Sequence, residues 1–157
     1  MTPRAEELVR TLSLAPHPEG GRYREIHRSA VERPGLRAAL TEIYFLLAAG
    51  EHSRWHRIDA DEVWNHLEGG PLELLWFREG DALVTRLQLG PAAEGGARPV
   101  AVVPAGAWQA ARPLGAFALA ACAVAPGFEF RGFRLLSGDP SAEAAFRSAH
   151  PLLTQLL

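Results

Sequence analysis

The sequence predicts an all-β domain that carries one short helix at each end. Between residues 40 and 136, short segments rich in apolar and aromatic residues alternate with turns that contain Gly or Pro. The 15 glycines and 12 prolines are spread along the chain and not gathered in one tract, so they indicate turns between successive elements. About ten short strands at this spacing are typical of a β-sandwich or barrel.

The N-terminal part of the chain predicts a helix followed by a tight turn. Thr2 and Pro3 suit the cap and the first position of a helix over about residues 3–12, and Leu8 and Leu12 give it an apolar face. The segment 15–21 has too much Pro and Gly for a regular element and is expected to be a turn. Residues 22–28 alternate weakly and indicate an edge strand.

The middle of the chain predicts the barrel, which we place at about residues 22–137. Strands are expected at 40–48, 53–57, 62–67, 72–77, 83–89, 100–103, 108–111, 116–124 and 133–136. Asp139 and Pro140 then suit the start of a helix over about residues 140–149. No linker or repeat interrupts the pattern, so residues 1–157 are interpreted as a single domain.

Composition narrows the class of protein. The formal net charge of −2 argues against nucleic acid as a partner, because such a partner selects a basic surface. One cysteine, Cys122, forms neither an internal disulfide nor a zinc finger, and no apolar run is long enough to cross a membrane. The polar N-terminus does not resemble a signal peptide, so a cytoplasmic protein is expected.

All 16 basic residues are arginine. This bias has a plain explanation in GC-rich coding, and an alternative in anion recognition, for which the planar guanidinium is well suited. Four arginines retain that second interpretation because they lie within the motif segments described below: Arg22, Arg24, Arg54 and Arg57.

Polar and aromatic residues are densest at positions 50–69, with a second cluster at 102–110. The first cluster holds Glu62 and half of the six histidines, namely His52, His56 and His66. Polar side chains that point into a barrel must be paired with other groups, so several of them together indicate a binding site.

The spacing of these residues resembles the two motifs of the cupin superfamily. Gly50, His56, Glu62 and Gly69 fall on the spacing of the first motif. Pro104-Ala105-Gly106 fits the second motif, but Gln109 occupies its histidine position.

Four longer segments narrow the resemblance to one branch, the cupin_5 group, over roughly residues 4–140. These are HPEGGRYRE (17–25), SRWHRIDADEVW (53–64), VPAGAWQAA (103–111) and VAPGFEF (124–130). The resemblance implies a double-stranded β-helix, the jelly-roll barrel of cupins, similar to that of the dTDP-sugar 3,5-epimerases. It also implies a homodimer, but it supplies no established reaction.

Metal-binding cupins use three histidines and one glutamate, and this chain departs from that set. Ile58 stands at the second histidine position and cannot bind a metal, and an amide oxygen at Gln109 is a poor substitute for imidazole. We therefore expect no cofactor. If a divalent metal binds, the expected ligands are His56, Glu62 and Gln109, with His52 or His66 as a stand-in.

Without a metal, the same positions predict a site for a small organic molecule. His56 and Glu62 are the expected catalytic pair, because imidazole titrates near neutrality and a nearby carboxylate raises its pKa. Gln109 would hydrogen-bond a substrate oxygen. The remaining residues expected to bind substrate are Tyr23, Trp55, Trp64, Trp108, Glu129 and Phe130.

Three functions stay open on this evidence. The chain is an isomerase or epimerase that acts on a sugar-like or other carbonyl compound, or a binding protein without chemistry, or a divalent-metal enzyme with a degenerate ligand set. The edge strand at 22–28 is expected to pair with a second subunit, since a free edge invites association.

Several of these residues also have a purely structural interpretation. Trp55 alternates with His56 and would then face outward, and Trp64 and Trp108 would fill the core. His17 would stabilise its turn, although its loop lies within reach of the barrel mouth. Cys122 is interpreted as a small buried apolar residue.

Overall fold

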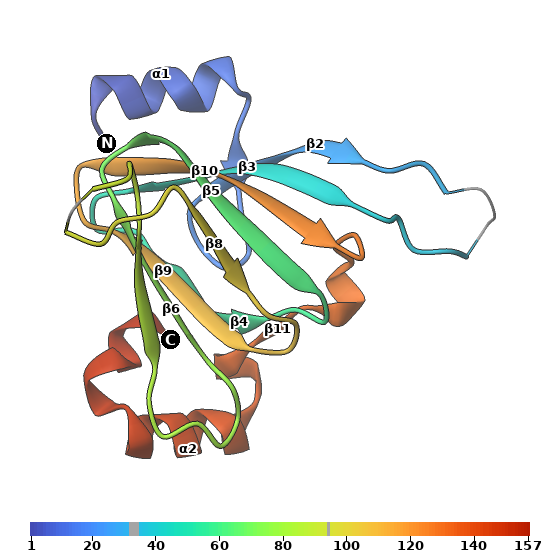
Figure 1. The fold of residues 1–157 in the computed structure, drawn as a ribbon, viewed down its shortest axis with the longest axis vertical. Coiled ribbons are helices and arrows are strands. Elements are labelled where there is room, and N and C mark those ends of the chain that lie inside the picture. Colours follow the sequence, from blue (N-terminus) through green and yellow to red (C-terminus); the bar gives the residue numbers. More distant parts are fainter. Residues whose placement is uncertain (32–34, 94) are drawn as a thin grey trace.

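The computed structural model describes residues 1–31, 35–93 and 95–157, and in these residues strands dominate (Figure 1). The helices are α1 (Pro3–Thr11), α2 (Pro140–Ala149) and the short 3-10 helices η1 (Phe130–Gly132), η2 (Leu136–Gly138) and η3 (Pro151–Leu156). The strands are β1 (Ala15–Pro16), β2 (Arg22–Arg28), β3 (Thr41–Ala48), β4 (Ser53–Arg57), β5 (Asp61–Gly69), β6 (Leu72–Phe77), β7 (Thr85–Leu89), β8 (Val100–Val103), β9 (Trp108–Pro113), β10 (Phe117–Ala125) and β11 (Arg134–Leu135).

The strands form two antiparallel sheets that face each other. The first sheet has the order β1-β2-β3-β10-β5-β8 and the second has the order β11-β4-β9-β6-β7. In the first sheet β10 lies between β3 and β5, and in the second sheet β9 lies between β4 and β6, so distant parts of the sequence meet at the centre of each sheet, as in the jelly roll. The predicted all-β class with a helix at each end is confirmed.

Two elements differ from the expectation. Ala15 and Pro16, expected within a turn, pair with Arg22 and Tyr23 as the short edge strand β1. Proline is compatible with an edge strand, where its missing N–H faces away from the ladder. The strand expected over 133–136 is reduced to two residues, because 3-10 helices flank it on both sides.

An apolar core fills the space between the sheets. Its largest members are Phe45 on β3, Trp64 on β5 and a set of leucines on β3, β6 and β7. Alternate side chains on each strand therefore point inward, and the β10 positions that face this core are small: Ala118, Ala120 and Cys122. Small residues on β10 leave room between the sheets, which the cavity described below uses.

The two helices cover opposite outer faces. Helix α1 packs Leu8 on Leu46 and Leu119, at the outer face of the first sheet, and its N-terminus is capped by Thr2, whose Oγ1 accepts from the Ala5 N–H at 3.2 Å. Helix α2 and η3 cover the outer face of the second sheet (Figure 1). In the part of the chain that is described, no helix is long and apolar enough to cross a membrane.

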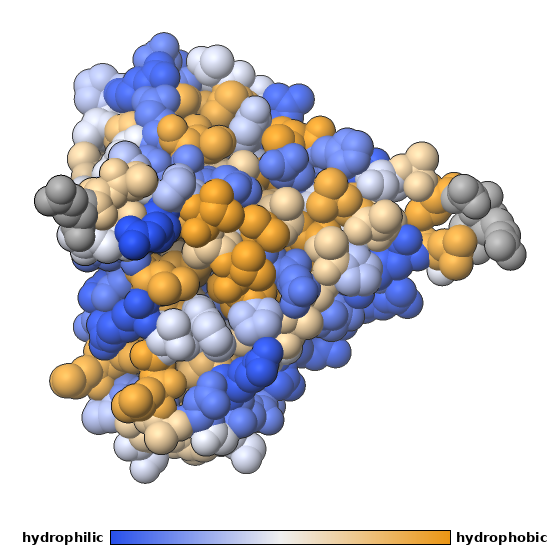
Figure 2. Space-filling model, in the orientation of Figure 1, coloured by the Kyte–Doolittle hydropathy of each residue, from blue (hydrophilic) through white to orange (hydrophobic). Residues whose placement is uncertain are grey.

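The edge formed by β7 and β8 carries exposed apolar residues. Among described residues, a single bridge between Leu89 and Arg98 joins the end of β7 to the segment before β8. Val100 and Val102 on β8 are each 50% exposed, and Figure 2 shows apolar side chains gathered in the middle of the face where β8 lies in Figure 1.

Candidate functional site

A cavity of about 340 Å³ lies between the two sheets. Strands β2, β3, β5 and β10 of the first sheet form most of its wall, β4 of the second sheet closes the opposite side, and the segment around η1 lies at its rim. The motif residues His56 and Glu62 both line it. The jelly roll therefore brings the two residues together inside the barrel, from strands in different sheets.

A β-bulge in β4 decides which side chains enter the cavity. Ser53 pairs with Ala111 and His56 pairs with Gln109, so two residues of β4 oppose a single residue of β9. Strict alternation would place Ser53 and His56 on opposite faces. The extra residue turns both of them inward, where Ser53 Oγ lies 3.5 Å from His56 Nδ1.

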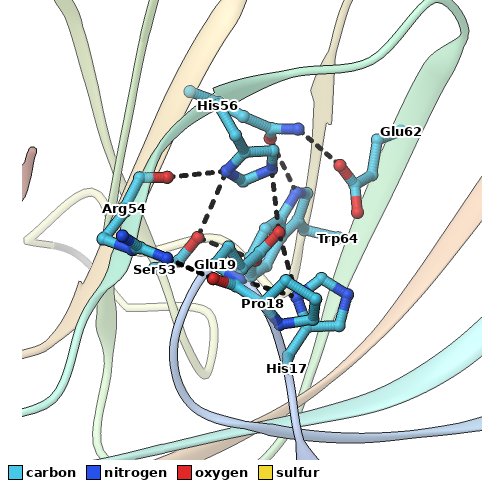
Figure 3. A network of polar contacts seen from close by, with 9 residues as sticks. His17, Pro18, Glu19, Ser53, Arg54, His56, Glu62 and Trp64 are labelled. Atoms are coloured by element: carbon cyan, nitrogen blue, oxygen red, sulfur yellow. Dashed lines mark hydrogen bonds and ion pairs between the residues drawn. The ribbon is translucent and has the colours of Figure 1, made fainter. Parts of the chain in front are cut away.

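The N-terminal loop adds Glu19 to this site, and Glu19 is 6% exposed (Figure 3). Its Oε1 accepts from Ser53 Oγ at 2.8 Å, and its Oε2 lies 3.3 Å from His56 Nε2 and 3.4 Å from His17 Nδ1. Glu19 therefore joins the two imidazoles and the serine hydroxyl into one buried network.

Gly20 allows the loop to lie directly on the start of β4. Its φ is +114°, and a Cβ at this position would lie 2.2 Å from the backbone oxygen of His52. The backbone oxygen of Glu19 accepts from the Arg54 N–H at 2.8 Å, which holds the loop in place. The glycine thus allows the close approach that carries the Glu19 carboxyl into the barrel.

The hydrogen bonds define the tautomers of both histidines. His56 Nδ1 donates to the Arg54 carbonyl at 2.7 Å, so Nε2 is the nitrogen that faces Glu19. His17 Nδ1 accepts from the Glu19 N–H at 3.3 Å. Burial lowers the pKa of His17 to about 4 and also lowers the pKa of His56, so both imidazoles are neutral at pH 7.

Burial acts on the carboxyl of Glu19 in the opposite direction. It raises the pKa of Glu19 to about 8, against the opposing effects of the Ser53 hydrogen bond and the Arg54 charge. At pH 7 the contact between Glu19 and His56 consequently joins a protonated carboxyl to a neutral imidazole and is not an ion pair. The two groups hold one transferable proton.

Glu62 lies on β5 and borders the cavity from the first sheet (Figure 3). Gln109 Nε2 donates to Glu62 Oε2 at 2.5 Å, and Trp64 Nε1 donates to Gln109 Oε1 at 3.2 Å. Burial raises the pKa of Glu62 to about 7, and the hydrogen bonds with Gln109 and Cys122 oppose this rise. Glu62 is thus divided between its two protonation states near neutral pH.

The expected substrate-binding residues divide into three groups. Tyr23, Trp64, Glu129 and Phe130 line the cavity. Gln109 is 1% exposed and lies behind Glu62, where both ends of its amide are already hydrogen-bonded. It therefore orients Glu62 and does not line the cavity, where a substrate oxygen would bind, contrary to the expectation.

The assignment of Trp55 and Trp108 to the ligand wall is wrong. Both are 1% exposed and lie in the apolar cluster between the second sheet and helices α2 and η3, away from the cavity. Trp55 Nε1 donates to the Leu153 carbonyl at 3.2 Å. Because the bulge turns His56 inward, the preceding residue faces outward and becomes a helix-packing residue.

Sequence reasoning did not identify Glu19, and it interpreted His17 as a turn residue whose loop could fold over the barrel mouth. A glutamate in a loop of prolines and glycines has no periodicity to show that it is buried. The signal that could have revealed it is its place in the HPEGGRYRE segment, next to two glycines that allow close packing. Cys122 lines the same cavity beside Glu62, and burial raises the pKa of its thiol, which keeps it protonated.

The residues at the motif positions do not fit a metal ion. Among the described residues, no group of three or more His, Cys, Asp or Glu side chains is arranged to hold one. Ile58 contributes an apolar side chain to the cavity wall, and the oxygen of Gln109 accepts from an indole. His66, considered as a stand-in, directs Nε2 to the Gly70 carbonyl at 3.1 Å.

Comparison with solved structures agrees with this fold. A protein from Shewanella oneidensis is 35% identical over 98% of this chain and 96% of its own, with a TM-score of 0.88. A hypothetical protein from Leishmania major is 30% identical over 97% of this chain and 95% of its own, with a TM-score of 0.81. A cupin 2 domain-containing protein from Halorhodospira halophila, 18% identical over 91% of this chain and 86% of its own, shares the fold with a TM-score of 0.58.

No curated protein matches the chain. The family model described as Cupin_5, cupin superfamily (DUF985), matches residues 6–136, which include the N-terminal loop, both motif regions and every strand. The chain therefore belongs to the Cupin_5 family of the cupin superfamily.

Proposed function

We propose that this protein transfers protons within a small carbonyl compound, as an isomerase or epimerase that needs no metal. One observation carries the proposal. Two acid–base groups on facing walls of one cavity, the Glu19–His56 pair and Glu62, change protonation state near neutral pH. Acid–base catalysis is most effective when the pKa of the catalytic group lies near the working pH.

The roles follow from the protonation states. The Glu62 carboxylate takes the proton from the carbon next to the carbonyl group, while the Glu19–His56 pair donates its proton to the carbonyl oxygen. The product of this step is an enol. Return of a proton to carbon, at the other face or at the neighbouring position, completes the isomerisation and restores both groups without any other reactant.

This assignment refines the roles expected from the sequence. His56 remains at the reacting centre, but the carboxyl in contact with it is Glu19 and not Glu62. Gln109 is a positioning residue, because its amide donates to Glu62 and does not reach into the cavity as a free donor. Tyr23 borders the cavity, where its ring lies perpendicular to the His17 ring with the two ring centroids 4.4 Å apart.

Solvent exchange tests the proposal. A panel of small aldoses, ketoses and ketones is incubated with the protein in D₂O, and incorporation of deuterium next to the carbonyl is followed by NMR. We expect exchange to fall by at least about 100-fold in Glu62→Gln and His56→Asn, the usual scale of acid–base catalysis. His66→Asn is the matched control, because His66 lies on β5 but does not line the cavity, and its Nε2 contacts the Gly70 carbonyl instead.

The pH profile separates this mechanism from exchange by other groups. Exchange should rise as Glu62 loses its proton, with a pKa of about 7, and fall as Glu19 loses its proton, with a pKa of about 8. No exchange with any carbonyl compound would refute the enzyme proposal. Ligand binding that persists in His56→Ala and Glu62→Gln, without exchange in the wild type, would instead identify a binding protein.

We also propose that β2 pairs with a second copy of this chain, as the family resemblance implies. Strand β1 covers only Arg22 and Tyr23 of β2, and the rest of this strand, ending at Arg28, is exposed. Figure 1 shows β2 at the outer side of the first sheet. Light scattering should give a dimer mass, and a monomer at micromolar concentration would contradict it. The cytoplasmic location expected from the sequence stays a prediction.

A further inference from the structure

The charges on the cavity wall show which ligands it accepts. Among the described residues that line it, four carry carboxyl groups and one carries a guanidinium. The carboxyl residues are Glu19, Glu25, Glu62 and Glu129, and the guanidinium belongs to Arg28. Glu25 is paired with Arg28 and Glu129 with Arg131, whereas no arginine acts on Glu62. An anionic ligand would therefore meet the Glu62 carboxylate without a cation to balance its charge.

The guanidinium of Arg28 is already committed to other partners. Its Nε and one terminal nitrogen donate to the two oxygens of Glu25 at 3.0 and 2.7 Å, and its other terminal nitrogen donates to the Phe128 carbonyl at 3.2 Å. Such a fork leaves little capacity for a phosphate or carboxylate.

The arginines that the sequence linked to anion binding lie elsewhere. Arg22 binds Glu51 at 2.6 Å and Arg57 binds Glu79 at 2.8 Å, and neither lines the cavity. Arg24 donates to the Leu12 carbonyl, and Arg54 donates to the Pro18 carbonyl. None of the four lines the cavity, so they supply no cation to a ligand bound there.

The other large component of the wall is aromatic. Tyr23, Phe45, Trp64, Phe128 and Phe130 all border the cavity. The face of an aromatic ring attracts a cation, most strongly where water is excluded. Aromatic faces together with buried carboxyls form a typical environment for an ammonium group.

We infer that the substrate of this site carries an ammonium group and no phosphate or carboxylate. The inference rests on the proposed function, because it specifies the carbonyl compound on which the enzyme acts. It sets this chain apart from epimerases of nucleotide sugars, whose diphosphate would need unpaired cations in the wall.

A cation in the cavity would also shift the protonation of the buried Glu62 carboxyl. Glu62 faces His56, Glu19, Gln109 and Cys122, and no arginine opposes the burial that raises its pKa. Around Glu19, His17, Ser53 and His56 make direct contact, and the charge of Arg54 acts on its pKa. An ammonium group stabilises the Glu62 carboxylate, so binding should release protons at pH 6.5, while Glu19 keeps the proton that it donates in the proposed reaction.

Three probes of nearly the same shape test the charge of the ligand. Choline is a permanent cation, 3,3-dimethylbutan-1-ol is its neutral counterpart, and 3,3-dimethylbutanoate is an anion. Calorimetry on the full chain should give at least about tenfold tighter binding for choline than for the alcohol, as expected for a desolvated cation over aromatic rings. The anion should bind most weakly.

Two variants connect the preference to the cavity. Glu62→Gln should reduce the advantage of choline over the alcohol several-fold and reduce proton release, which is measured in buffers of different ionisation enthalpy. Glu19→Gln replaces a carboxyl that is already uncharged at pH 6.5, so it should change both quantities less. Circular dichroism verifies that each variant is folded. Glu68→Gln, a change at an exposed residue paired with Arg4, should leave both quantities unchanged.

The outcomes separate this inference from the proposed function. The ammonium assignment would be overturned if the three probes bind with equal affinity, if none of them binds detectably, or if the anion binds most tightly. Preference for choline without solvent exchange on any carbonyl compound, aminoketones included, would refute the proposed enzyme and leave the ligand class standing. Solvent exchange on a phosphorylated sugar, together with no preference for choline, would support the proposed enzyme and refute the ammonium assignment.

Discussion

Replacement of Glu19 by Gln should make the protein more stable relative to wild type as the pH rises. The carboxyl is buried against Ser53 and His56, and burial raises its pKa from 4.5 to about 8. Gln preserves the shape, accepts from the Ser53 hydroxyl and donates to His56 Nε2, but it does not ionise. The difference between the two proteins therefore reports the cost of keeping a carboxyl buried.

The magnitude follows from the two pKa values. Below about pH 4.5 the carboxyl is protonated in both the folded and the unfolded chain, and its burial carries no pH-dependent cost. Between 4.5 and 8 the unfolded chain releases this proton and the folded chain keeps it, so the free energy of unfolding falls by up to about 1.4 kcal/mol per pH unit. From pH 5 to pH 7 the loss is on the order of 2 to 3 kcal/mol.

Urea unfolding of both proteins at pH 5, 6 and 7 measures this quantity. The free energy of unfolding of Glu19→Gln minus that of wild type should increase over the series. Glu68→Gln is the control, because an exposed carboxyl held in its ionised form by Arg4 has a lowered pKa and does not follow this trend. A difference that stays constant from pH 5 to pH 7 would refute the buried, protonated Glu19.

Three further predictions follow from the same contacts. Gly20→Ala should lower the free energy of unfolding in urea by about 3 kcal/mol or more, because its Cβ would collide with the backbone. Gly80→Ala is the control, since a Cβ there meets no atom within 4 Å, and it should lower the free energy of unfolding by only about 1 kcal/mol because of its positive φ. Trp55→Phe should lower the free energy of unfolding by about 1 to 2 kcal/mol through the lost indole hydrogen bond, and unchanged choline affinity would verify that Trp55 lies outside the cavity. Gln109→Leu should raise the pKa of Glu62 above about 7 and shift the rising limb of the exchange profile to higher pH; an unshifted limb would contradict the role of this amide.

The pattern of turns and apolar segments was sufficient to predict most of the strands. Strand alternation and Gly or Pro punctuation are local properties, and the spacing of Gly50, His56, Glu62 and Gly69 placed two polar side chains in the barrel wall. Caps at Thr2 and Asp139 likewise mark the helix starts from neighbouring residues alone.

The misassigned residues share one cause, which is that their positions depend on contacts between distant segments. Trp55 faces away from His56 by strand alternation, but the elements that it packs on, α2 and η3, lie about a hundred residues later in the chain. Gln109 was expected to meet a substrate, but the structure places Trp64 and Glu62 at both ends of its amide. No local pattern states which partner an interior amide finds.

By itself the sequence determined the fold class, the family and two of the polar residues that line the cavity, His56 and Glu62, because these depend on periodicity and spacing along the chain. Only the tertiary structure decided that a proline- and glycine-rich loop lies against β4 and delivers Glu19 to His56. It also decided that Arg28 is already paired at the wall of an acidic cavity. Burial and pairing set the charge of each group, and both come from segments that meet only when the chain is folded.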